Sequence, residues 1–347
     1  MQNTKEAFGG CSVLLLGDIL QLRPVLGRFI FEEPICENYH LPFLIDPLWQ
    51  KFEVIFLTYN HRQGEDRPYA EILNRIRTGK QTEEDYASLE TRVRKMGDKD
   101  LPTDALFIIC TNDKVKKMND ARIEDLDGEE PELPAQVRCG SKIVPRPKLA
   151  RDGSIFNTPL QHKLRLKVGA QVMLTYNVDV LDSLTNGAIG EVIGFEMTTD
   201  GKNVKNILIQ FKNPRVGQER RKKNSAILQR KFPNIPVTPI SKIEFKFNLS
   251  KNPTSKNDCL TATQFPLKLA FACTAHKMQG STVCKPDSLV IDLESVREAA
   301  QAYVMMSRVQ SISQLYILNK LPHQKIYPST TAMKELKRLE DISLLPL

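Results

Sequence analysis

The chain has 347 residues, of which 41% are hydrophobic and 26% are charged, so it can bury a sizeable core and differs in composition from a disordered protein. Its apolar runs are far shorter than the roughly 20 residues that a membrane span needs, and its first residues lack the pattern of a secretory signal. We therefore expect an intracellular protein that does not cross a membrane. Lys and Arg outnumber Asp and Glu by 49 to 41, an excess that is compatible with a polyanionic partner without requiring one.

The first 110 residues alternate apolar runs with helical patterns. Each apolar run is short, has the composition of a buried parallel strand, and ends in polar residues. We expect strands at residues 11–16, 54–57 and 105–110, and helices at residues 69–77 and 83–93. Because strands that alternate with helices form parallel sheets, the pattern predicts a doubly wound α/β fold.

Between about residues 130 and 265 the pattern changes to short β runs. Asn186-Gly187, Asp200-Gly201 and proline-rich stretches separate the runs, which predicts a small antiparallel barrel inserted in the α/β fold. The basic segment 212–231 lies in this region; such a segment is usually a solvated loop, and a contact to backbone phosphates is the alternative. The β runs cover residues 171–175, 190–195, 204–211 and 243–247.

The α/β pattern returns after residue 265. It predicts a strand at residues 267–273, a polar segment at 274–282, a strand at 289–292, a helix at 295–307 and a strand at 314–318.

The seven cysteines and five histidines are scattered along the chain. No two cysteines form a C-x-x-C pair, and no local spacing of Cys and His matches a zinc site. We therefore expect neither a disulfide scaffold nor a structural metal, and we assign no metal ligand.

Four polar segments follow or close the predicted elements, at residues 17–24, 60–63, 272–282 and 303–309. Asp18 can hold a water or a metal, and the Gln21 amide can sense a phosphate oxygen. The hydroxyls, lysine and glycine of residues 272–282 can wrap a phosphate or a nucleic-acid backbone. Each segment also has a plain structural explanation, such as an Asp-capped turn, a surface ion pair for Arg62, or a helix-dipole partner for Arg308.

Taken together, in this order and at these separations, the segments resemble the petite integration frequency (PIF) DNA helicases. These belong to superfamily 1B, are RecD-like, and include the helicase part of Helitron transposon proteins. The likeness covers most of the chain. Its motifs are Phe8-Gly9-Gly10, residues 17–24, Leu57 to Arg62-Gln63, Val168-Gly169 with Val172-Met173-Leu174, Asn186-Gly187 to Gly190-Glu191-Val192, residues 274–282, and Tyr303 to Arg308.

The resemblance implies an α/β fold of P-loop NTPase (RecA-like) domains, the first of them incomplete and the second carrying an inserted small SH3-like β-barrel. The implied boundaries are residues 1–58 for the first domain, 59–165 with 263–347 for the second, and 166–262 for the inserted module. The implied function is that of an ATP-dependent 5′-to-3′ DNA helicase in genome maintenance, DNA repair, recombination, telomere maintenance or transposition. Its cofactors would be ATP and Mg²⁺, and its partners single-stranded DNA and duplex junctions. The resemblance favours a monomer in the nucleus, with the mitochondrion as the alternative.

The resemblance also implies roles for individual residues. Gln21 would orient the attacking water or sense the γ-phosphate, and Arg62 and Arg308 would act as arginine fingers. Asp18 and Gly280 would join them around the nucleotide. The implied DNA contacts are Thr111, Asn112, Thr274, His276, Lys277, Gln279 and Thr282. We interpret Asn186-Gly187 as a structural turn.

A phosphate loop of the form G-x-x-x-x-G-K-[ST] does not occur in the sequence, nor does the acidic pair that helps hold magnesium. The nearest match, Gly79-Lys80-Gln81-Thr82, has Asn74 in place of the first glycine and predicts a helix-ending turn. We therefore expect a helicase fragment that lacks the Walker A and Walker B elements and does not hydrolyse ATP by itself. The alternative is a non-catalytic remnant that binds single-stranded DNA.

Overall fold

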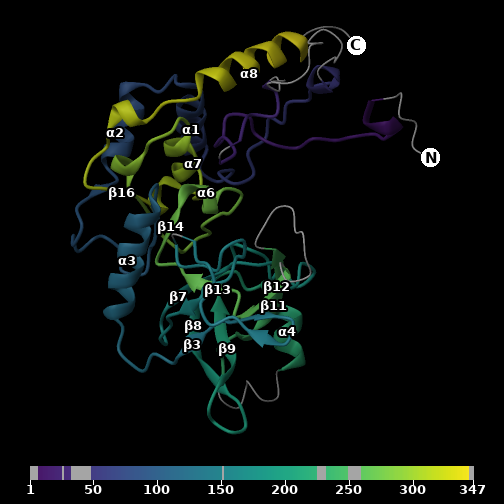
Figure 1. Cartoon of the computed structure of the whole chain (residues 1–347). Coiled ribbons are helices and arrows are strands. Elements are labelled where there is room, and N and C mark those ends of the chain that lie inside the picture. Colours follow the sequence, from purple (N-terminus) through teal and green to yellow (C-terminus); the bar gives the residue numbers. More distant parts are fainter. Residues whose placement is uncertain are drawn as a thin grey trace. The chain divides into compact units, whose positions relative to one another are not determined.

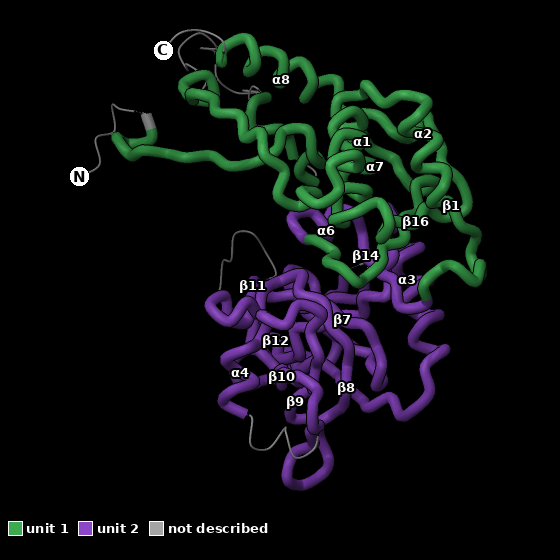
Figure 2. The backbone as a smooth tube through the Cα atoms, turned by 180° about the vertical axis from the view of Figure 1, so that it is seen from behind, with its two compact units in different colours: residues 1–102, 282–347 green, residues 103–281 purple. Residues whose placement is uncertain are grey.

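The structure is a computed structural model that describes residues 7–25, 27–32, 48–150, 152–224, 232–248 and 259–343. The chain divides into two compact units, coloured separately in Figure 2. The first unit comprises Met1–Pro102 and Thr282–Leu347, and the second comprises Thr103–Ser281. Among the described residues, no helix combines the length and the apolar character that a bilayer crossing requires.

In its described residues the first unit contains three parallel strands and four α-helices; β16 and the four helices are labelled in Figure 1. Strand β16 lies between β1 and β15 and pairs in parallel with both. The elements are β1 (Val93–Arg94), β15 (Leu289–Ile291), β16 (Leu315–Leu318), α1 (Arg67–Thr78), α2 (Glu83–Glu90), α7 (Gln301–Met306) and α8 (Thr330–Ser343). Short 3-10 turns cover Ala7–Gly10, Leu48–Lys51, Leu293–Ser295, Ile312–Gln314 and His323–Lys325.

Helix α1 has clear start and stop signals in the sequence. The Asp66 carboxylate accepts a hydrogen bond from the Tyr69 N–H at its beginning, and Gly79 ends it in the left-handed conformation. Its last turn is joined to α2, because Arg75 donates two hydrogen bonds of 2.7 and 2.6 Å to the Asp85 carboxylate. Asp85 also completes a capping box with Thr82, so one carboxylate both starts α2 and fixes it to α1.

The second unit contains a pair of parallel strands and three antiparallel sheets. The parallel pair is β2 (Leu106–Ile109) with β14 (Ala272–Thr274), which lead into α3 (Asn112–Glu124) and α6 (Ala275–Met278). The largest antiparallel sheet has the order β10-β9-β8-β7-β13, formed by Val237–Ser241, Val204–Phe211, Ile189–Met197, Gln171–Leu174 and Leu267–Leu269. A four-stranded sheet joins β11 (Ile243–Asn248), β12 (Cys259–Gln264), β4 (Gln136–Cys139) and β5 (Lys142–Ile143), and β3 (Leu133–Pro134) pairs with β6 (Lys163–Leu164).

The run at residues 267–273, predicted as one strand, forms two. Strand β13 pairs with β7 in the antiparallel sheet, whereas β14 pairs in parallel with β2. The buried Asn119 side chain fixes the start of β14, since its amide group exchanges hydrogen bonds of 3.0 and 2.9 Å with the Ala272 backbone. The chain therefore passes from the β region into the parallel pair within a few residues.

Most of the other predicted elements are confirmed, including α1, β2, β7, β8, β9, β11, β15 and β16. The helix predicted at residues 83–93 is shorter than expected, because α2 ends at Glu90 and Val93 begins β1. The predicted fold class, mixed α/β with parallel strands, is also correct. The β region is antiparallel as expected, and its closure into an SH3-like barrel stays a prediction, as do the domain boundaries. The turn at Asn186-Gly187 is present directly before β8, with Gly187 at a φ of +94°.

Two predicted strands are wrong. Residues 11–16 and 54–57 form no strand, and Leu14, Leu16, Ile55 and Leu57 are 80%, 81%, 86% and 88% exposed. An apolar strand is stable in a parallel sheet only when neighbours pair with it on its edges, and no described residue pairs with these segments.

Two further predictions need correction. The helix expected at residues 295–307 begins only at Gln301, because Ala300 is left-handed and the Gln301 side chain accepts hydrogen bonds from the Arg297 and Glu298 N–H groups. The basic segment is not a continuous loop, since Gln218–Lys223 form helix α4, whose first N–H groups bond to Asp182. Residues 225–231 lie outside the described residues. Helix α8 was not predicted.

Gly190 is required by a close approach of two strands. A Cβ atom at this position in β8 would lie 2.6 Å from Ile209 Cγ2 and 2.7 Å from the carbonyl oxygen of Gln210. Neither atom can move away easily, because both belong to β9, which is paired with β8 on one side and β10 on the other. Gly194 lies in β8 as well, but a Cβ atom added there would make only ordinary contacts, at 3.4 Å or more.

We predict that Gly190→Ala lowers the free energy of unfolding by about 1–3 kcal/mol, because the extra methyl group overpacks the sheet. The matched control Gly194→Ala should change it by less than about 0.5 kcal/mol. Urea unfolding followed by circular dichroism measures both. Equal effects of the two substitutions would show that the close approach at Gly190 does not limit the packing.

Candidate functional site

Three guanidinium groups gather in the first unit around Tyr303 and Asp18. Arg62 precedes α1, Arg77 lies in the last turn of α1, and Arg308 follows α7. Burial, and then the charge of Asp18, raises the pKa of Tyr303, while the charges of all three arginines oppose this shift. The Tyr303 side chain therefore lies within electrostatic reach of all four charged groups, and we call Arg62, Arg77 and Arg308 the arginine cluster.

Arg308 is held almost completely out of solvent. Its side chain is among the largest buried ones, and the residue is only 1% exposed. Its Nε donates a 2.7 Å hydrogen bond to the Val304 carbonyl, and a terminal nitrogen donates one of 2.7 Å to Ser307 Oγ. Burial, and then the neighbouring charge of Arg62, lowers the pKa of Arg308 to about 10. The group remains charged at neutral pH, and an anion close to it would stabilise it.

Arg62 is positioned by the end of α7. Its Nε donates to Thr282 Oγ1 at 2.8 Å and a terminal nitrogen donates to the Ser307 carbonyl at 3.0 Å. The next residue, Gln63, donates to the Ser307 and Val309 carbonyls and is itself buried. Burial lowers the pKa of Arg62 from its ordinary value. Arg62 and Arg308 thus both bond to Ser307 at the end of α7, and the charge of one acts on the other.

Asp18 and Gln21 lie beside this cluster. Asp18 Oδ1 forms a 3.1 Å ion pair with Arg77, and Asp18 Oδ2 accepts a 3.4 Å hydrogen bond from Gln21 Nε2. The buried Nε of Arg77 has no hydrogen-bond partner among the described residues. Arg77 and Arg308 therefore share one carboxylate that is already engaged, and the charge of Arg62 acts on Arg308. This gathering of positive charge fits a phosphate group.

The same residues do not fit a magnesium ion. Mg²⁺ prefers carboxylate oxygens that are free to coordinate, whereas both oxygens of Asp18 accept hydrogen bonds from this chain. Among the described residues, no three His, Cys, Asp or Glu side chains lie close enough together to hold a metal ion.

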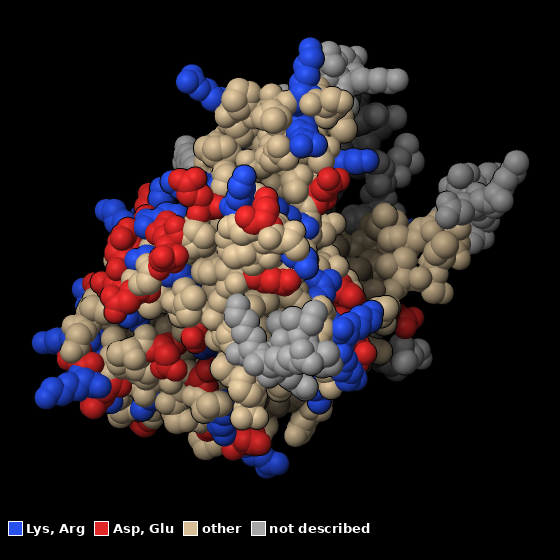
Figure 3. Space-filling model, turned by 90° about the horizontal axis from the view of Figure 1, so that it is seen from below, with Lys and Arg blue, Asp and Glu red and all other residues tan. Residues whose placement is uncertain are grey.

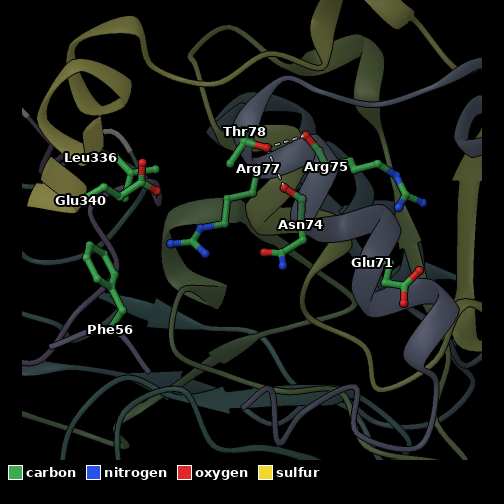
Figure 4. Close-up of a pocket in the computed structure, with 8 residues that line it drawn as sticks. All are labelled: Phe56, Glu71, Asn74, Arg75, Arg77, Thr78, Leu336 and Glu340. Atoms are coloured by element: carbon green, nitrogen blue, oxygen red, sulfur yellow. Dashed lines mark hydrogen bonds between the residues drawn. The ribbon is translucent and has the colours of Figure 1, made fainter. Parts of the chain in front are cut away.

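Arg77 also lines an open pocket of about 440 Å³ between α1 and α8, shown in Figure 4. The Arg77 side chain points from α1 toward the side of the pocket formed by Leu336, Glu340 and Phe56. The remaining lining residues are Glu71, Asn74, Arg75 and Thr78. Two arginines line the pocket. Arg75 is paired with Asp85 of α2, whereas Arg77 is paired with Asp18 and so connects the pocket to the arginine cluster.

The expected DNA contacts gather at one edge of the parallel pair in the second unit. Strands β2 and β14 run side by side in register, with Thr274 opposite Ile109. Thr111 and Asn112 follow the first strand, and His276 and Lys277 follow the second. Asn112, Lys277 and Gln279 are exposed, Thr111 and His276 are half-buried, and Thr274 is buried at the start of α6. The parallel pairing thus brings these residues to a common edge.

Two of the predicted site residues lie elsewhere. Gly280 belongs to the second unit and not to the unit that holds the arginine cluster, and its φ of +84° explains the glycine. Thr282 belongs to the first unit, where its hydroxyl accepts the hydrogen bond from Arg62. Their assigned roles stay predictions.

Sequence reasoning missed Arg77, Tyr303 as a neighbour of the cluster, and Lys268. Lys268 lies in β13, where burial and then the charge of Lys277 lower its pKa from the ordinary value. The sequence carried a signal for Lys268, because a lysine between Leu267 and Leu269 interrupts an otherwise apolar run. It carried a weaker one for Arg77, whose position in a helix is typical of a surface arginine.

The net positive charge is not gathered in one uniform patch on the face shown in Figure 3, where basic and acidic side chains are interspersed. Particular groups, such as the arginine cluster, are therefore more informative than the overall charge.

Comparison with known proteins shows similarity to one group of helicases. The family model for the 2B domain of the DNA helicase Pif1 matches residues 155–195. The ATP-dependent DNA helicase PIF1 of Danio rerio is 29% identical over 92% of this chain and 42% of its own length. The ATP-dependent DNA helicase Pif1 of Bdellovibrio bacteriovorus is 28% identical over 94% and 62%. An uncharacterized protein, 030L, of Invertebrate iridescent virus 6 is 28% identical over 90% and 66%. The chain thus spans from about two fifths to two thirds of the length of these relatives.

Solved structures show the same fold. Pif1 helicase from Candida albicans superposes with a TM-score of 0.63 and 23% identity, over 84% of this chain and 63% of that protein. Bacteroides Pif1 bound to single-stranded DNA superposes with a TM-score of 0.64 and 23% identity, over 97% and 68%. The parallel strands and their helices are therefore those of the RecA-like α/β fold of these helicases. Over nine tenths of its length the chain is similar in sequence to Pif1 helicases, and residues 155–195 match the model of the Pif1 2B domain.

Proposed function

We propose that this chain supplies the nucleotide-sensing and DNA-holding parts of an ATP-dependent 5′-to-3′ DNA helicase. Such an enzyme acts on single-stranded DNA and duplex junctions in genome maintenance, repair, recombination or transposition. The observation that carries the proposal is the convergence of Arg62 and Arg308 at the end of α7, beside Asp18 and Gln21. Two rigidly held guanidinium groups that carboxylates do not outnumber can stabilise the negative charge that develops during phosphoryl transfer.

Each residue of the cluster would have a distinct task. Arg62 and Arg308 neutralise negative charge at the γ-phosphoryl group. Both side chains are held in place before the nucleotide binds, so they need not rearrange during the reaction. Gln21 orients the attacking water through its amide, while Asp18 holds Gln21 and Arg77 in place. Bound ATP supplies the phosphoryl group, and Asp18 would not hold the accompanying Mg²⁺, because both of its oxygens accept hydrogen bonds from this chain.

DNA contact and nucleotide sensing are joined through a short piece of chain. Lys277 on α6 and Thr282, the partner of Arg62, are separated by only four residues. A shift of α6 when it holds a DNA phosphate would therefore pull on the hydroxyl that positions Arg62. Thr111, Asn112, Thr274, His276 and Gln279 would hold the strand beside Lys277 at the common edge of β2 and β14.

We predict that the 347-residue chain alone shows no DNA-stimulated ATP turnover, because its sequence contains no phosphate loop. Inserting the chain in place of the aligned segment of the Bdellovibrio relative should give an active hybrid that unwinds duplexes with a 5′ tail and not those with a 3′ tail. In the hybrid, Arg62→Ala and Arg308→Lys should each lower kcat by about 10³-fold.

Arg67→Ala is the matched control, because Arg67 is an exposed arginine at the start of α1 outside the cluster. Thermal melting of each hybrid checks that it is folded. If folded Arg62→Ala and Arg308→Lys hybrids turned over ATP at the rate of the Arg67→Ala hybrid, the proposed roles would be wrong.

The second candidate function is binding of single-stranded DNA without catalysis. The observation that favours it is the division of sites: all the expected DNA contacts except Thr282 lie in the second unit, whereas the arginine cluster lies in the first. DNA affinity that ATP does not change, in a hybrid that also lacks turnover, would favour this candidate over the helicase.

We predict that the chain binds a fluorescent oligothymidine and that Lys277→Ala weakens binding while making it less dependent on salt. Losing one phosphate contact should lower the slope of log K against log salt by about 0.7. Fluorescence anisotropy at several salt concentrations measures this, with Lys142→Ala, an exposed lysine of β5, as the control. An unchanged salt slope in Lys277→Ala would exclude a phosphate contact by Lys277.

A further inference from the structure

Ser307, the residue that follows α7, is bonded to both arginines of the proposed nucleotide site. Its carbonyl oxygen accepts a 3.0 Å hydrogen bond from a terminal nitrogen of Arg62. Its hydroxyl oxygen accepts a 2.7 Å hydrogen bond from a terminal nitrogen of Arg308. One residue therefore holds two guanidinium groups, the first through its backbone and the second through its side chain.

The Ser307 hydroxyl is itself fixed by the last turn of the helix. It donates a 3.1 Å hydrogen bond to the Val304 carbonyl, which also accepts the 2.7 Å bond from Arg308 Nε. Because a hydroxyl has a single proton and this one is directed at Val304, its oxygen acts toward Arg308 as an acceptor. Ser307 is 3% exposed, so water does not readily replace its bonds. The hydroxyl thus restrains the end of the Arg308 side chain.

The two contacts of Ser307 respond differently to a substitution. Arg62 bonds to the backbone carbonyl, which every residue type at position 307 retains. Gln63 donates to the same carbonyl and to that of Val309, so this stretch of backbone is held independently of the hydroxyl. Arg308 bonds to the side chain. Removing the hydroxyl alone should therefore release the end of Arg308 and leave Arg62 in position.

We propose that Ser307 is a positioning residue, which holds Arg308 where it and Arg62 contact the γ-phosphoryl group of ATP together. Ser307 acts through Arg308 and does not itself touch the nucleotide. Since a nucleoside diphosphate lacks the γ-phosphoryl group, Ser307 sets how strongly the site prefers the triphosphate. The inference rests on the proposed nucleotide-sensing function and adds a specificity-determining residue to it.

The test uses the hybrid with the Bdellovibrio relative, because the chain itself contains no phosphate loop. Ser307→Ala should lower the affinity for ATPγS, a slowly hydrolysed triphosphate, by about tenfold, because the released guanidinium group no longer meets the γ-phosphoryl group. It should lower kcat by about 10- to 100-fold for the same reason. The affinity for ADP should change by less than about twofold, since ADP has no group for Arg308 to contact. Isothermal titration calorimetry measures both affinities.

Ser295→Ala is the matched control. Ser295 is also buried in the first unit, and its hydroxyl donates to the carbonyl three residues earlier, that of Asp292, at 2.6 Å. A general loss of stability would appear in both variants, whereas the ratio of ATPγS to ADP affinity should fall only in Ser307→Ala. Ser307→Cys fills the space of the hydroxyl with a weak acceptor and should lower the ratio as well.

A second measurement uses the 347-residue chain without nucleotide. The Nε–H signals of Arg62 and Arg308 in nitrogen-15 NMR spectra report the hydrogen bonds of each side chain, and the Arg62→Ala and Arg308→Lys variants assign them. Ser307→Ala should shift the Arg308 signal and leave the Arg62 signal unchanged. Equal shifts of both signals, or a shift of neither, would show that the hydroxyl does not hold Arg308 separately, and would overturn the proposal.

Thermal melting shows which hybrids are folded, and Ser307→Cys decides if Ser307→Ala is not. A folded Ser307 variant with the affinity ratio of Ser295→Ala would overturn the proposal. So would equal losses of ADP and ATPγS affinity, because Ser307 would then support the whole site. If this happens while Arg62→Ala and Arg308→Lys lose turnover, the inference falls and the proposed function stands. If those two variants keep full turnover, both fall.

Discussion

The carbonyl groups at the end of α7 are the constraint on which the first unit depends. A helix leaves its last carbonyls without partners, and here side chains from residues 62–69 satisfy them. Arg62 and Gln63 bond to the Ser307 carbonyl, and Tyr69 bonds to the Met306 carbonyl at 2.8 Å. These bonds align α1 with α7, which places Arg62 next to Arg308. The arginine cluster is thus a consequence of how one helix is capped.

The second unit depends on a comparable pair of buried hydrogen bonds. Asn119 pairs with both backbone groups of Ala272, where the chain leaves the antiparallel sheet and enters β14. A buried amide that is fully paired fixes the register of β14 against β2 at low cost, whereas an unpaired one would destabilise the fold. The positions of His276 and Lys277 follow from that register, because α6 begins directly after β14.

Local signals in the sequence were sufficient for most elements and for the residues of the helicase motifs. The helical spacing of apolar residues located α1 and α2, and apolar runs located β2, β15 and β16. The same runs misled at residues 11–16 and 54–57, because an apolar segment becomes a strand only if another strand pairs with it. Arg77 and Lys268 were missed since their importance comes from neighbours distant in sequence, Asp18 in one case and Lys277 in the other. The spacing of residues along a sequence does not show which distant residues become neighbours in the fold.

The bond between Arg62 and the Ser307 carbonyl joins residues 245 positions apart, and the whole second unit lies between them in the sequence. During synthesis, Arg62 leaves the ribosome long before its partner exists. The second unit, whose residues form one continuous stretch, is complete earlier and is free to fold first. Closing the first unit then requires a contact of very high sequence separation, which slows folding. The two halves of the first unit therefore meet last, and the arginine cluster is assembled only when nearly all of the chain has emerged.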